Sequence, residues 1–338
     1  MQTPADLGFR MPAEWEPHER CWMAWPCRPE SWDNGLPAAY DAYTAVARAI
    51  RRFEPVTMIA RPEDADTARQ LLGDDIDVIA WPLDDSWTRD IGPLFLKGRN
   101  GEVAGVDWGF NAWGLLYEGF AEDARIAGRI LDHVGARRFA GPQILEGGSI
   151  HVDGQGTLLT TEECLFDPER NPHLRREDME ANLKGWLGVE TVIWLGKGLQ
   201  NDETTGHVDN VACFAAPGKV LMVTSEDPAD PDTATLKDNR DRLREARDAQ
   251  GRPLEIIDLP QAPRRNDARG ERMALSYVNF YIANGGVVMP SFGVPEDKDA
   301  ADILRHAFPD HVVTQVPAFE VAVGGGNIHC ITQQQPKA

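Results

Sequence analysis

Several features that would indicate a membrane, secreted or metal-bound protein are missing from this 338-residue sequence. Its apolar runs are too short to span a membrane, and the opening MQTPADLGFRMPAEW lacks the basic start and apolar stretch of a secretory signal. The five cysteines form an odd number and include no CxxC pair, so neither a disulfide framework nor a structural zinc site is supported. We therefore expect a soluble cytoplasmic protein without a metal ion.

Positive charge is scarce as well. Lys and Arg number 34 against 54 Asp and Glu, which gives a net charge of −20 at pH 7. No basic stripe is available to neutralise phosphates, so we expect no nucleic-acid partner. An acidic surface kept for solubility accounts for most of this charge, and the negative field is also compatible with a cationic substrate.

Apolar, β-rich runs alternate with helical patterns along the whole chain, which indicates an α/β protein. Strands are predicted at 55–60, 75–82, 157–161, 191–195, 219–225 and 254–260, with a strand or hairpin at 278–293. Helices are predicted at 38–53, 63–73, 121–136, 176–188, 233–250 and 297–308. Because no Pro/Ser/Gly-rich linker divides the chain, we expect one continuous domain over 1–338.

Short segments of the chain repeat one another. LEGGSIHV (145–152) matches VGGGNIHC (323–330) at two glycines, the Ile and the His, and GHVDN (206–210) repeats the HVD of 151–153. Such internal similarity indicates a structure built from related α/β units. We expect the ligand-binding groups to gather where these units meet.

Four polar clusters stand at strand ends or in glycine-rich turns, where functional side chains are usually found. They are DDSWTRDIGP (84–93), EGGSIH (146–151), NDETTGHVDN (201–210) and GGGNIHC (324–330). Together they supply several carboxylates, three histidines and a Cys.

The chemistry of these residues limits the reaction. Cys330 with His207 would form a nucleophile and a general acid/base. Carboxylates from Asp90, Asp209 and Glu146 would oppose the oxyanion of an acyl transfer, but they suit a guanidinium, which is a cation rich in N–H donors. This set of residues indicates amidine hydrolysis, with a bound cation helping to form the thiolate.

Each residue type also has a structural alternative. A lone Cys is more often a buried thiol, and His151 and His329, which stand in strand-like repeats, suit structural hydrogen-bonding roles. Arg89 could pair with the adjacent Asp90. Trp87 suits the core or a pocket wall, where its ring would add a cation–π contribution to guanidinium binding.

Longer stretches of the chain resemble the agmatine deiminase family, in the superfamily of guanidino-modifying enzymes that includes arginine and peptidyl-arginine deiminases. Besides the clusters quoted above, the matching stretches are MPAEWEPHERCWMAWP (11–26), FNAWG (110–114), LEGGSIHVDGQGTLLTTEECL (145–165), NPH (171–173) and YVNFYIANGG (277–286). The resemblance implies a pentein fold, a five-fold pseudosymmetric α/β propeller of ββαβ units.

The resemblance also implies roles. Cys330 matches the nucleophile, His207 the acid/base, and Glu146 the acid that supports the His, while Asp90 and Asp209 match the carboxylates that hold the guanidinium. The implied reaction converts agmatine to N-carbamoylputrescine and ammonia through an amidino-cysteine, with no metal or organic cofactor.

Trp87 and Gly325 are also expected to contribute to substrate binding. The oligomeric state stays open, with a homodimer among the alternatives.

Two segments depart from the family pattern. Thr205 stands where many relatives have Asp or Asn before the Gly-His pair, and LLYEGFAED follows FNAWG in place of a GG-rich segment. Both lie near the expected pocket for the substrate tail, where Asp202 or Glu203 would bind the distal amine of agmatine.

Other functions remain as alternatives. The closest is a deiminase for free or peptidyl arginine, although an acidic tail pocket would repel the α-carboxylate of arginine. A dimanganese ureohydrolase would need clustered His/Asp ligand motifs that the sequence lacks, and a papain-like protease would place carboxylates against its oxyanion. A non-enzymatic amine-binding module would not need both Cys330 and His207.

Overall fold

The computed structural model describes residues 2–338, and the strands of this part of the chain form five sheets. Each sheet contains the same unit: two antiparallel strands, then a helix, then a third strand that runs parallel to the second. Three consecutive units supply β5 (Leu94–Gly98), β6 (Val103–Gly109), α5 (Ile126–His133) and β7 (Arg137–Ile144); β8 (Ile150–Val152), β9 (Thr157–Thr161), α7 (Arg176–Leu187) and β10 (Thr191–Leu195); and β11 (Ala212–Ala216), β12 (Lys219–Thr224), α8 (Asp232–Glu245) and β13 (Glu255–Pro260).

The fourth unit follows directly, and the fifth joins the two ends of the chain. The fourth contains β14 (Tyr281–Ala283), β15 (Gly286–Ser291), α9 (Glu296–Ala307) and β16 (Val312–Pro317). In the fifth, β17 (Gln333–Pro336) pairs antiparallel with β2 (His18–Ala24), and α1 (Leu36–Arg51) leads to β3 (Val56–Ala60), which runs parallel to β2. The closing sheet therefore combines the first and last long strands of the chain.

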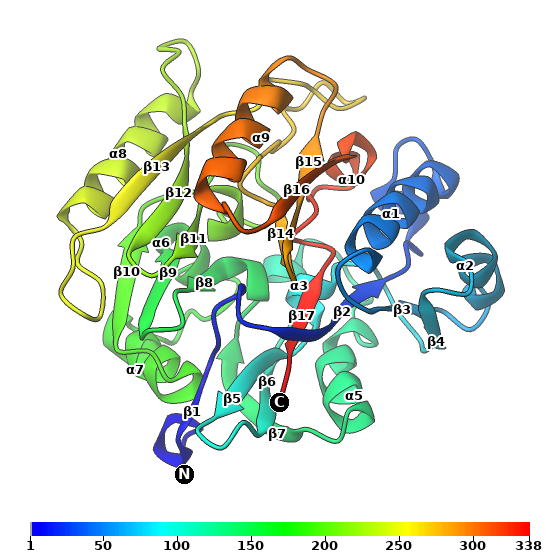
Figure 1. Cartoon of the computed structure of the whole chain (residues 1–338), viewed down its shortest axis with the longest axis horizontal. Helices are drawn as coiled ribbons and strands as arrows, with labels where there is room; N and C mark the ends of the chain where they lie inside the picture. Colours follow the sequence, from blue (N-terminus) through cyan, green and yellow to red (C-terminus); the bar gives the residue numbers. More distant parts are fainter. Residues whose placement is uncertain (1) are drawn as a thin grey trace.

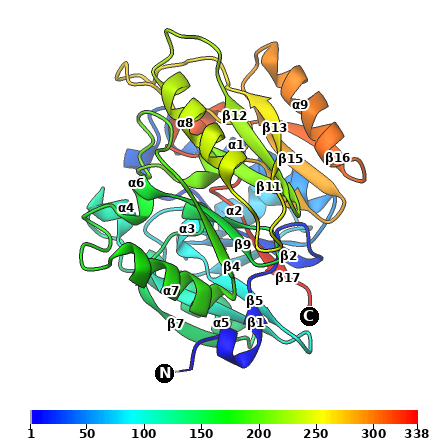
Figure 2. The ribbon, with the colours of Figure 1, turned by 90° about the vertical axis from the view of Figure 1, so that its left-hand side faces the viewer.

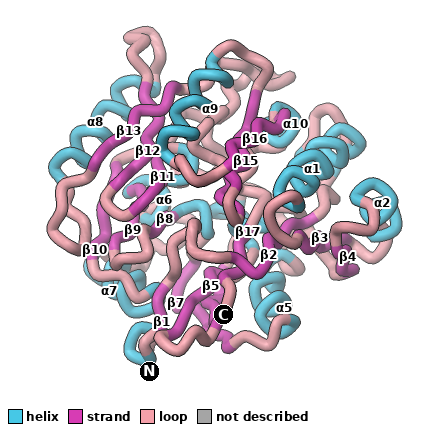
Figure 3. Tube along the Cα trace, viewed as in Figure 1, coloured by secondary structure: helices cyan, strands magenta, loops and turns pink. Residues whose placement is uncertain are grey.

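The long helices surround the sheets. In Figure 1, α1, α5, α7, α8 and α9 lie toward the periphery and most strands lie inside them, whereas β4 lies at the right-hand edge; Figure 3 shows the same arrangement by element type. Figure 2, turned by 90°, brings α7 and α8 toward the viewer. The α/β fold of ββαβ units predicted from the sequence is confirmed.

Shorter elements extend the sheets or connect them. α2 (Ala65–Leu72) leads to β4 (Asp77–Ala80), which extends the fifth sheet, and β1 (Phe9–Arg10) extends the first. The remaining short helices are η1 (Ala5–Leu7), η2 (Pro29–Ser31), α3 (Thr88–Ile91), α4 (Ala112–Leu115), η3 (Asp123–Arg125), η4 (Gly147–Ser149), α6 (Glu162–Leu165), η5 (Val208–Asn210) and α10 (Phe319–Val323). Among the described residues, no helix combines the length and the apolar character needed to cross a bilayer.

Apolar spacing explains the helices. α1 buries Ala39, Tyr43, Val46, Ala47 and Ile50, whose intervals of one to four residues place them on one face. Most predicted strands and helices are confirmed within a few residues, but the predicted helix at 121–136 is α-helical only over Ile126–His133. α8 ends at Glu245 rather than 250, because the backbone turns extended at Ala246. The expectation of a single domain stays a prediction.

Candidate active site

The predicted site residues stand at equivalent places in successive units. Asp90 lies in α3 just before β5, Glu146 precedes η4 and β8, and His207 and Asp209 lie at η5 before β11. Cys330 lies in the turn before β17. The repeated sequence segments therefore mark the inner end of the first strand in several units, and the fold brings these ends together.

Measured distances place the five predicted residues in one buried cluster. Sγ of Cys330 lies 3.7 Å from Oδ2 of Asp209. The two ring nitrogens of His207 each lie 3.9 Å from a carboxylate oxygen, Nδ1 from Asp90 and Nε2 from Glu146. All five residues are buried. The predicted nucleophile, acid/base and carboxylates are thus within reach of a single small group.

Glycines are required where the loops meet. A Cβ on Gly148 would lie 2.5 Å from Nδ1 of His207 and 2.8 Å from Oδ2 of Asp209, closer than real side chains approach. A Cβ on Gly326 would lie 2.5 Å from the ring of Trp87 and 3.1 Å from Cβ of Cys330. The glycine residues before Cys330 therefore let the backbone pack against the pocket wall.

Beside Cys330 lies a pocket of about 30 Å³ with two tryptophan walls. Its lining residues are Trp87, Asp90, Trp113, Leu116, Glu203, Thr204, Gly324, Gly325, Gly326 and Cys330. Trp87 stacks on Trp32 with ring centroids 5.9 Å apart, which fixes the wall from behind. Gly325 has a φ of +104°, and a Cβ there would meet Oε2 of Glu203 at 2.7 Å. Trp87 and Gly325 are thus pocket residues.

Asp90 is held in a defined orientation. Nε1 of Trp113 donates to its Oδ2 at 2.9 Å, and the backbone N–H of Gly148 donates to its Oδ1 at 2.8 Å. The proposed pairing of Arg89 with Asp90 is wrong. The Arg89 guanidinium points away and donates to Glu14 at 3.3 Å and to Gln333 at 2.8 Å, because the segment before β2 and the start of β17 bring these acceptors to its other side.

His329 occupies a turn rather than the strand-like position suggested by its sequence. Its Nδ1 lies 2.8 Å from Oδ2 of Asp209 and its Nε2 lies 2.9 Å from Oε1 of Glu14. The imidazolium form satisfies both contacts, because it carries an N–H on each nitrogen. His151 lies in β8, where its Nδ1 accepts from the backbone N–H of Phe214 at 3.3 Å. Both histidines therefore have structural hydrogen bonds.

Arg170 is a buried partner of the site that the sequence reasoning did not identify. Its Nε donates to Oε1 of Glu146 at 2.8 Å, and its Nη2 donates to the carbonyl of Thr204 at 2.7 Å. One side chain thus connects the supporting carboxylate with the loop that lines the pocket. The available signal was its position directly before Asn171, where the NPH stretch begins.

Burial and neighbouring charges shift the pKa values of the site in different directions. Burial opposes the charge on Glu146, but Arg170 and His207 together outweigh it and hold the pKa at about 2. Burial also lowers the pKa of His207, yet Asp90 and other acidic neighbours hold that pKa well above its usual value. Burial and then Asp209 and Asp90 raise the pKa of Cys330. Before substrate binds, the site therefore favours an imidazolium and a thiol.

The two acids predicted for the substrate tail differ in place. Glu203 lines the pocket, and its Oε1 lies 3.8 Å from Nη2 of Arg269. Asp202 does not line it. Its Oδ1 accepts from the backbone N–H and the hydroxyl of Thr204 at 2.9 and 2.6 Å, as expected for a short acid that stabilises a turn. Of the two alternatives, only Glu203 therefore lines the pocket, and its binding of the substrate tail stays a prediction.

Two buried groups each contain three side chains of types that can bind a metal ion, with their ligand atoms within 4.8 Å of one another. They are Glu14, His151 and His329, and Glu146, Cys164 and His207. In each group an arginine already donates to the Glu, Arg89 in the first and Arg170 in the second. These positive charges oppose a second cation, so we assign both groups to hydrogen-bond networks.

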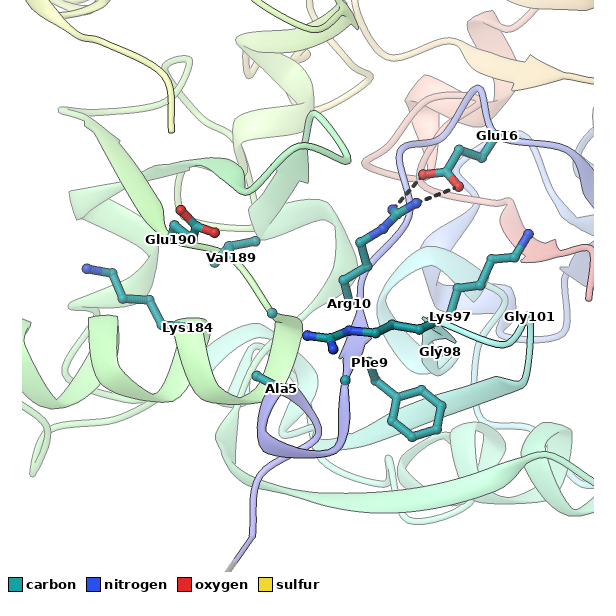
Figure 4. Close-up of a pocket in the computed structure, with 13 residues that line it drawn as sticks. Ala5, Phe9, Arg10, Glu16, Lys97, Gly98, Gly101, Lys184, Val189 and Glu190 are labelled. Atoms are coloured by element: carbon teal, nitrogen blue, oxygen red, sulfur yellow. Dashed lines mark hydrogen bonds and ion pairs between the residues drawn. The ribbon is translucent and has the colours of Figure 1, made fainter. Parts of the chain in front are cut away.

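A separate surface hollow of about 690 Å³ lies beside β1 and β5, away from this cluster. Figure 4 shows Lys97 and Lys184 around it, with Arg10 donating to both carboxylate oxygens of Glu16 at 2.6 and 3.0 Å. Its lining contains no Cys, His or Asp, so it offers neither the nucleophile nor the acid/base of the buried pocket.

Comparison with known proteins shows the family of the chain. The model of the Porphyromonas-type peptidyl-arginine deiminase family matches residues 10–336. An agmatine deiminase of Pseudomonas aeruginosa (strain LESB58) is 48% identical over 358 residues, which cover 99% of this chain and 97% of that protein. The chain belongs to the agmatine deiminase family. The solved agmatine deiminase of Enterococcus faecalis superposes with a TM-score of 0.96 at 40% identity, covering 100% of this chain and 98% of that one.

A second solved member of the agmatine deiminase family is a Cys-to-Ser variant from C. jejuni with substrate bound. It superposes with a TM-score of 0.88 at 25% identity, covering 98% of this chain and 97% of that one. The agmatine deiminase fold thus extends over the whole described chain.

Proposed function

We propose that this chain hydrolyses the guanidinium group of agmatine to N-carbamoylputrescine and ammonia through a covalent amidino-cysteine. The observation that carries the proposal is the placement of the Cys330 sulfur among carboxylates, with Asp209 at 3.7 Å and Asp90 lining the same pocket. Such a setting destabilises an oxyanion but stabilises a cationic electrophile. A guanidinium carbon is the electrophile that fits.

Unpartnered polar atoms support a ligand rich in N–H donors. Within residues 2–338, Oδ1 of Asp209, Oε2 of Glu146 and both ring nitrogens of His207 are buried without a hydrogen-bond partner. Buried polar atoms normally have partners, and because the two carboxylate oxygens can only accept, they call for a group with N–H donors beside them. A guanidinium can donate to the two carboxylates while its carbon faces Cys330.

The steps follow from this placement. As the cationic guanidinium binds, the Cys330 thiol releases its proton to solvent, and the thiolate forms a C–S bond to the guanidinium carbon. His207 donates its proton to the leaving nitrogen, the C–N bond breaks and ammonia departs. Neutral His207 then takes a proton from water, whose oxygen attacks the amidino carbon. Collapse of that adduct breaks the C–S bond, its hydroxyl proton passes to the sulfur, and the carbamoyl product leaves with the Cys330 thiol restored.

The charge of the pocket mouth favours agmatine over arginine. Glu203 lines the pocket, where its carboxylate would attract the distal ammonium of agmatine and repel the α-carboxylate of arginine. The Cys-to-Ser agmatine deiminase of C. jejuni has substrate bound, in keeping with a sulfur that serves reaction rather than binding. A homodimeric state and a cytoplasmic location stay predictions.

The test is ammonia release from agmatine and, separately, from arginine, with EDTA present. We expect release from agmatine and none from arginine, and loss of turnover in Cys330→Ser with agmatine binding retained by calorimetry. Turnover by Cys330→Ser near the wild-type rate would remove Cys330 as the nucleophile. Activity on arginine alone would contradict the tail assignment while keeping the deiminase chemistry.

A further inference from the structure

Asn279 occupies, in the fourth unit, the place that the catalytic residues occupy in the others. It lies shortly before β14, as Asp90 lies before β5 and Cys330 before β17. Its side chain is fully buried, and its Nδ2 lies 3.2 Å from Sγ of Cys330. The side-chain amide of Asn279 therefore contacts the reacting atom directly.

The orientation of this amide is fixed by the groups around it. Its Oδ1 accepts from the backbone N–H of His329 at 2.9 Å and from that of Cys330 at 3.4 Å. Its Nδ2 also faces two acceptors, Oδ1 of Asn210 at 3.0 Å and the carbonyl of Asp209 at 3.3 Å. In a flipped amide the N–H groups would face the backbone N–H groups and the oxygen would face the two acceptors. The nitrogen is therefore the amide atom nearer the sulfur, at 3.2 Å, and the oxygen lies 3.5 Å away.

The charged groups around the sulfur make such a donor useful. Asp90 on α3 and Asp209 on η5 face Cys330 and disfavour its thiolate. His207 supplies positive charge on one side, and the imidazolium of His329 on the other is already held by Asp209 and Glu14. A neutral donor can stabilise the thiolate without repelling a cationic substrate, which an additional Lys or Arg would do.

We infer that Asn279 is a catalytic residue whose Nδ2–H donates a hydrogen bond to the Cys330 thiolate and lowers the cost of forming the nucleophile. In the thiol form, the S–H faces Oδ1 of Asn279 at 3.5 Å and Oδ2 of Asp209 at 3.7 Å. When the proton leaves, the Nδ2–H remains aimed at the sulfur. This inference rests on the proposed function, in which Cys330 attacks the substrate.

Two variants separate the donor from the other effects of this side chain. Asn279→Asp keeps the oxygen that accepts from the backbone of His329 and Cys330, but it loses the donor and gains charge. Asn279→Ala loses both the donor and the acceptor and gains no charge. If the donor matters, both variants should be impaired. If only the added charge matters, Asn279→Asp alone should be impaired, and if only the backbone anchor matters, Asn279→Ala alone should be impaired.

The measurement is the rate at which iodoacetamide inactivates each protein as a function of pH, since this neutral reagent reacts with the thiolate. We expect the midpoint of the profile to rise by about one pH unit or more in both variants, and kcat for agmatine to fall about 10- to 100-fold, as for a lost bond to a charged group. In a Cys330→Ser background, Asn279→Ala should change agmatine affinity less than about threefold, because the amide faces the sulfur rather than the substrate.

The matched control is Asn239→Asp. Asn239 is also fully buried, and its amide accepts from the N–H of Gly196 and donates to the carbonyl of Lys197, both at 2.8 Å. The Asn239→Asp variant makes the same chemical change in α8, away from the sulfur, and should leave the pH midpoint of inactivation unchanged. Unchanged midpoints in folded Asn279→Ala would overturn the inference.

If neither variant folds, the native residue answers the same question. The side-chain amide protons of Asn279, observed by NMR in asparagine-labelled protein, should shift as pH passes the inactivation midpoint in wild type and stay constant in Cys330→Ser. Constant resonances in both proteins would exclude the bond. Alkylation of Cys330 needs no turnover, so the hydrogen bond from Asn279 can be confirmed even if agmatine proves not to be the substrate. Conversely, the alkylation result can overturn this bond even if agmatine is turned over.

Discussion

The indole of Trp113 donates a hydrogen bond from Nε1 to Oδ2 of Asp90 at 2.9 Å, while the same ring forms a wall of the pocket. The bond points the carboxylate toward the space beside Cys330. The backbone of Trp113 has a φ of +54°, a conformation that costs a bulky residue about 1–3 kcal/mol. One residue thus orients the carboxylate and shapes the cavity, and its backbone strain is maintained by the surrounding structure.

Trp113→Phe should therefore weaken guanidine hydrolysis while leaving the fold intact. The ring wall is kept but the donor to Asp90 is lost, so we expect kcat/KM for agmatine to fall about 10-fold or more. Trp108→Phe is the matched control, because the Nε1 of Trp108 is buried without a hydrogen-bond partner among the described residues. Equal losses in the two variants would mean that the bond to Asp90 has no special role.

Glu203→Gln should act on the substrate tail. Removing the negative charge at the pocket mouth should raise KM for agmatine about 10-fold and leave KM for propylguanidine, which has a neutral tail, nearly unchanged. Asp202→Asn serves as the comparison, since Asp202 bonds to Thr204 within the loop. It should affect both substrates alike and lower the melting temperature. A selective effect of Asp202→Asn on agmatine would reverse our assignment.

Gly148→Ala tests the close approach of the loops. Its Cβ would lie 2.5 Å from Nδ1 of His207, so the imidazole must move and we expect at least a 100-fold loss in kcat. Gly185→Ala in α7 is the control, because the nearest atom there is a Thr3 methyl group at 3.1 Å, at the end of a movable side chain. Activity, with circular dichroism to verify folding, distinguishes the two. Near-normal turnover in Gly148→Ala would show that the site is looser than this geometry.

The buried Glu146–Arg170 pair predicts a specific loss of stability in acid. The pKa of Glu146 is about 2 in the folded protein against 4.5 as a model value, so the unfolded state takes up the proton first. The stabilisation is complete above about pH 4.5 and is lost as pH falls toward 2. This stabilisation of the folded state amounts to about 3 kcal/mol, because each unit of difference in pKa between the folded and unfolded states corresponds to about 1.36 kcal/mol. Denaturant unfolding across this range should show a steeper decline for wild type than for Glu146→Gln, and parallel declines would contradict the assignment.

The sequence predicted the reacting residues well, because each stands within a short motif whose chemistry is visible in one segment. Cys330, His207, Asp90, Asp209 and Glu146 belong to this group, and the structure brings them together. Their catalytic roles stay predictions until turnover is measured. The repeated segments also indicated related units, and the five sheets account for them.

The supporting residues could not be predicted in this way, because their partners are distant in sequence. Asn279 meets Cys330 across 51 positions, and Arg89 meets Gln333 across 244. β17 was missed for a related reason. Its sequence QQQP is polar, yet it is buried, and its side chains bond to groups such as the carbonyl of Pro93. Only the tertiary structure supplies those partners.

The joining of β17 to β2 has a consequence for folding kinetics. The pairing of Gln333 with Trp22 closes a loop of nearly the whole chain, and loop-closure entropy makes such long-range pairings slow to form. Cys330 lies three positions before the start of β17, so we expect its sulfur to reach the carboxylates only when that pairing is made. Recovery of activity during refolding should consequently lag behind recovery of secondary structure, which makes catalysis a reporter of the final step of assembly.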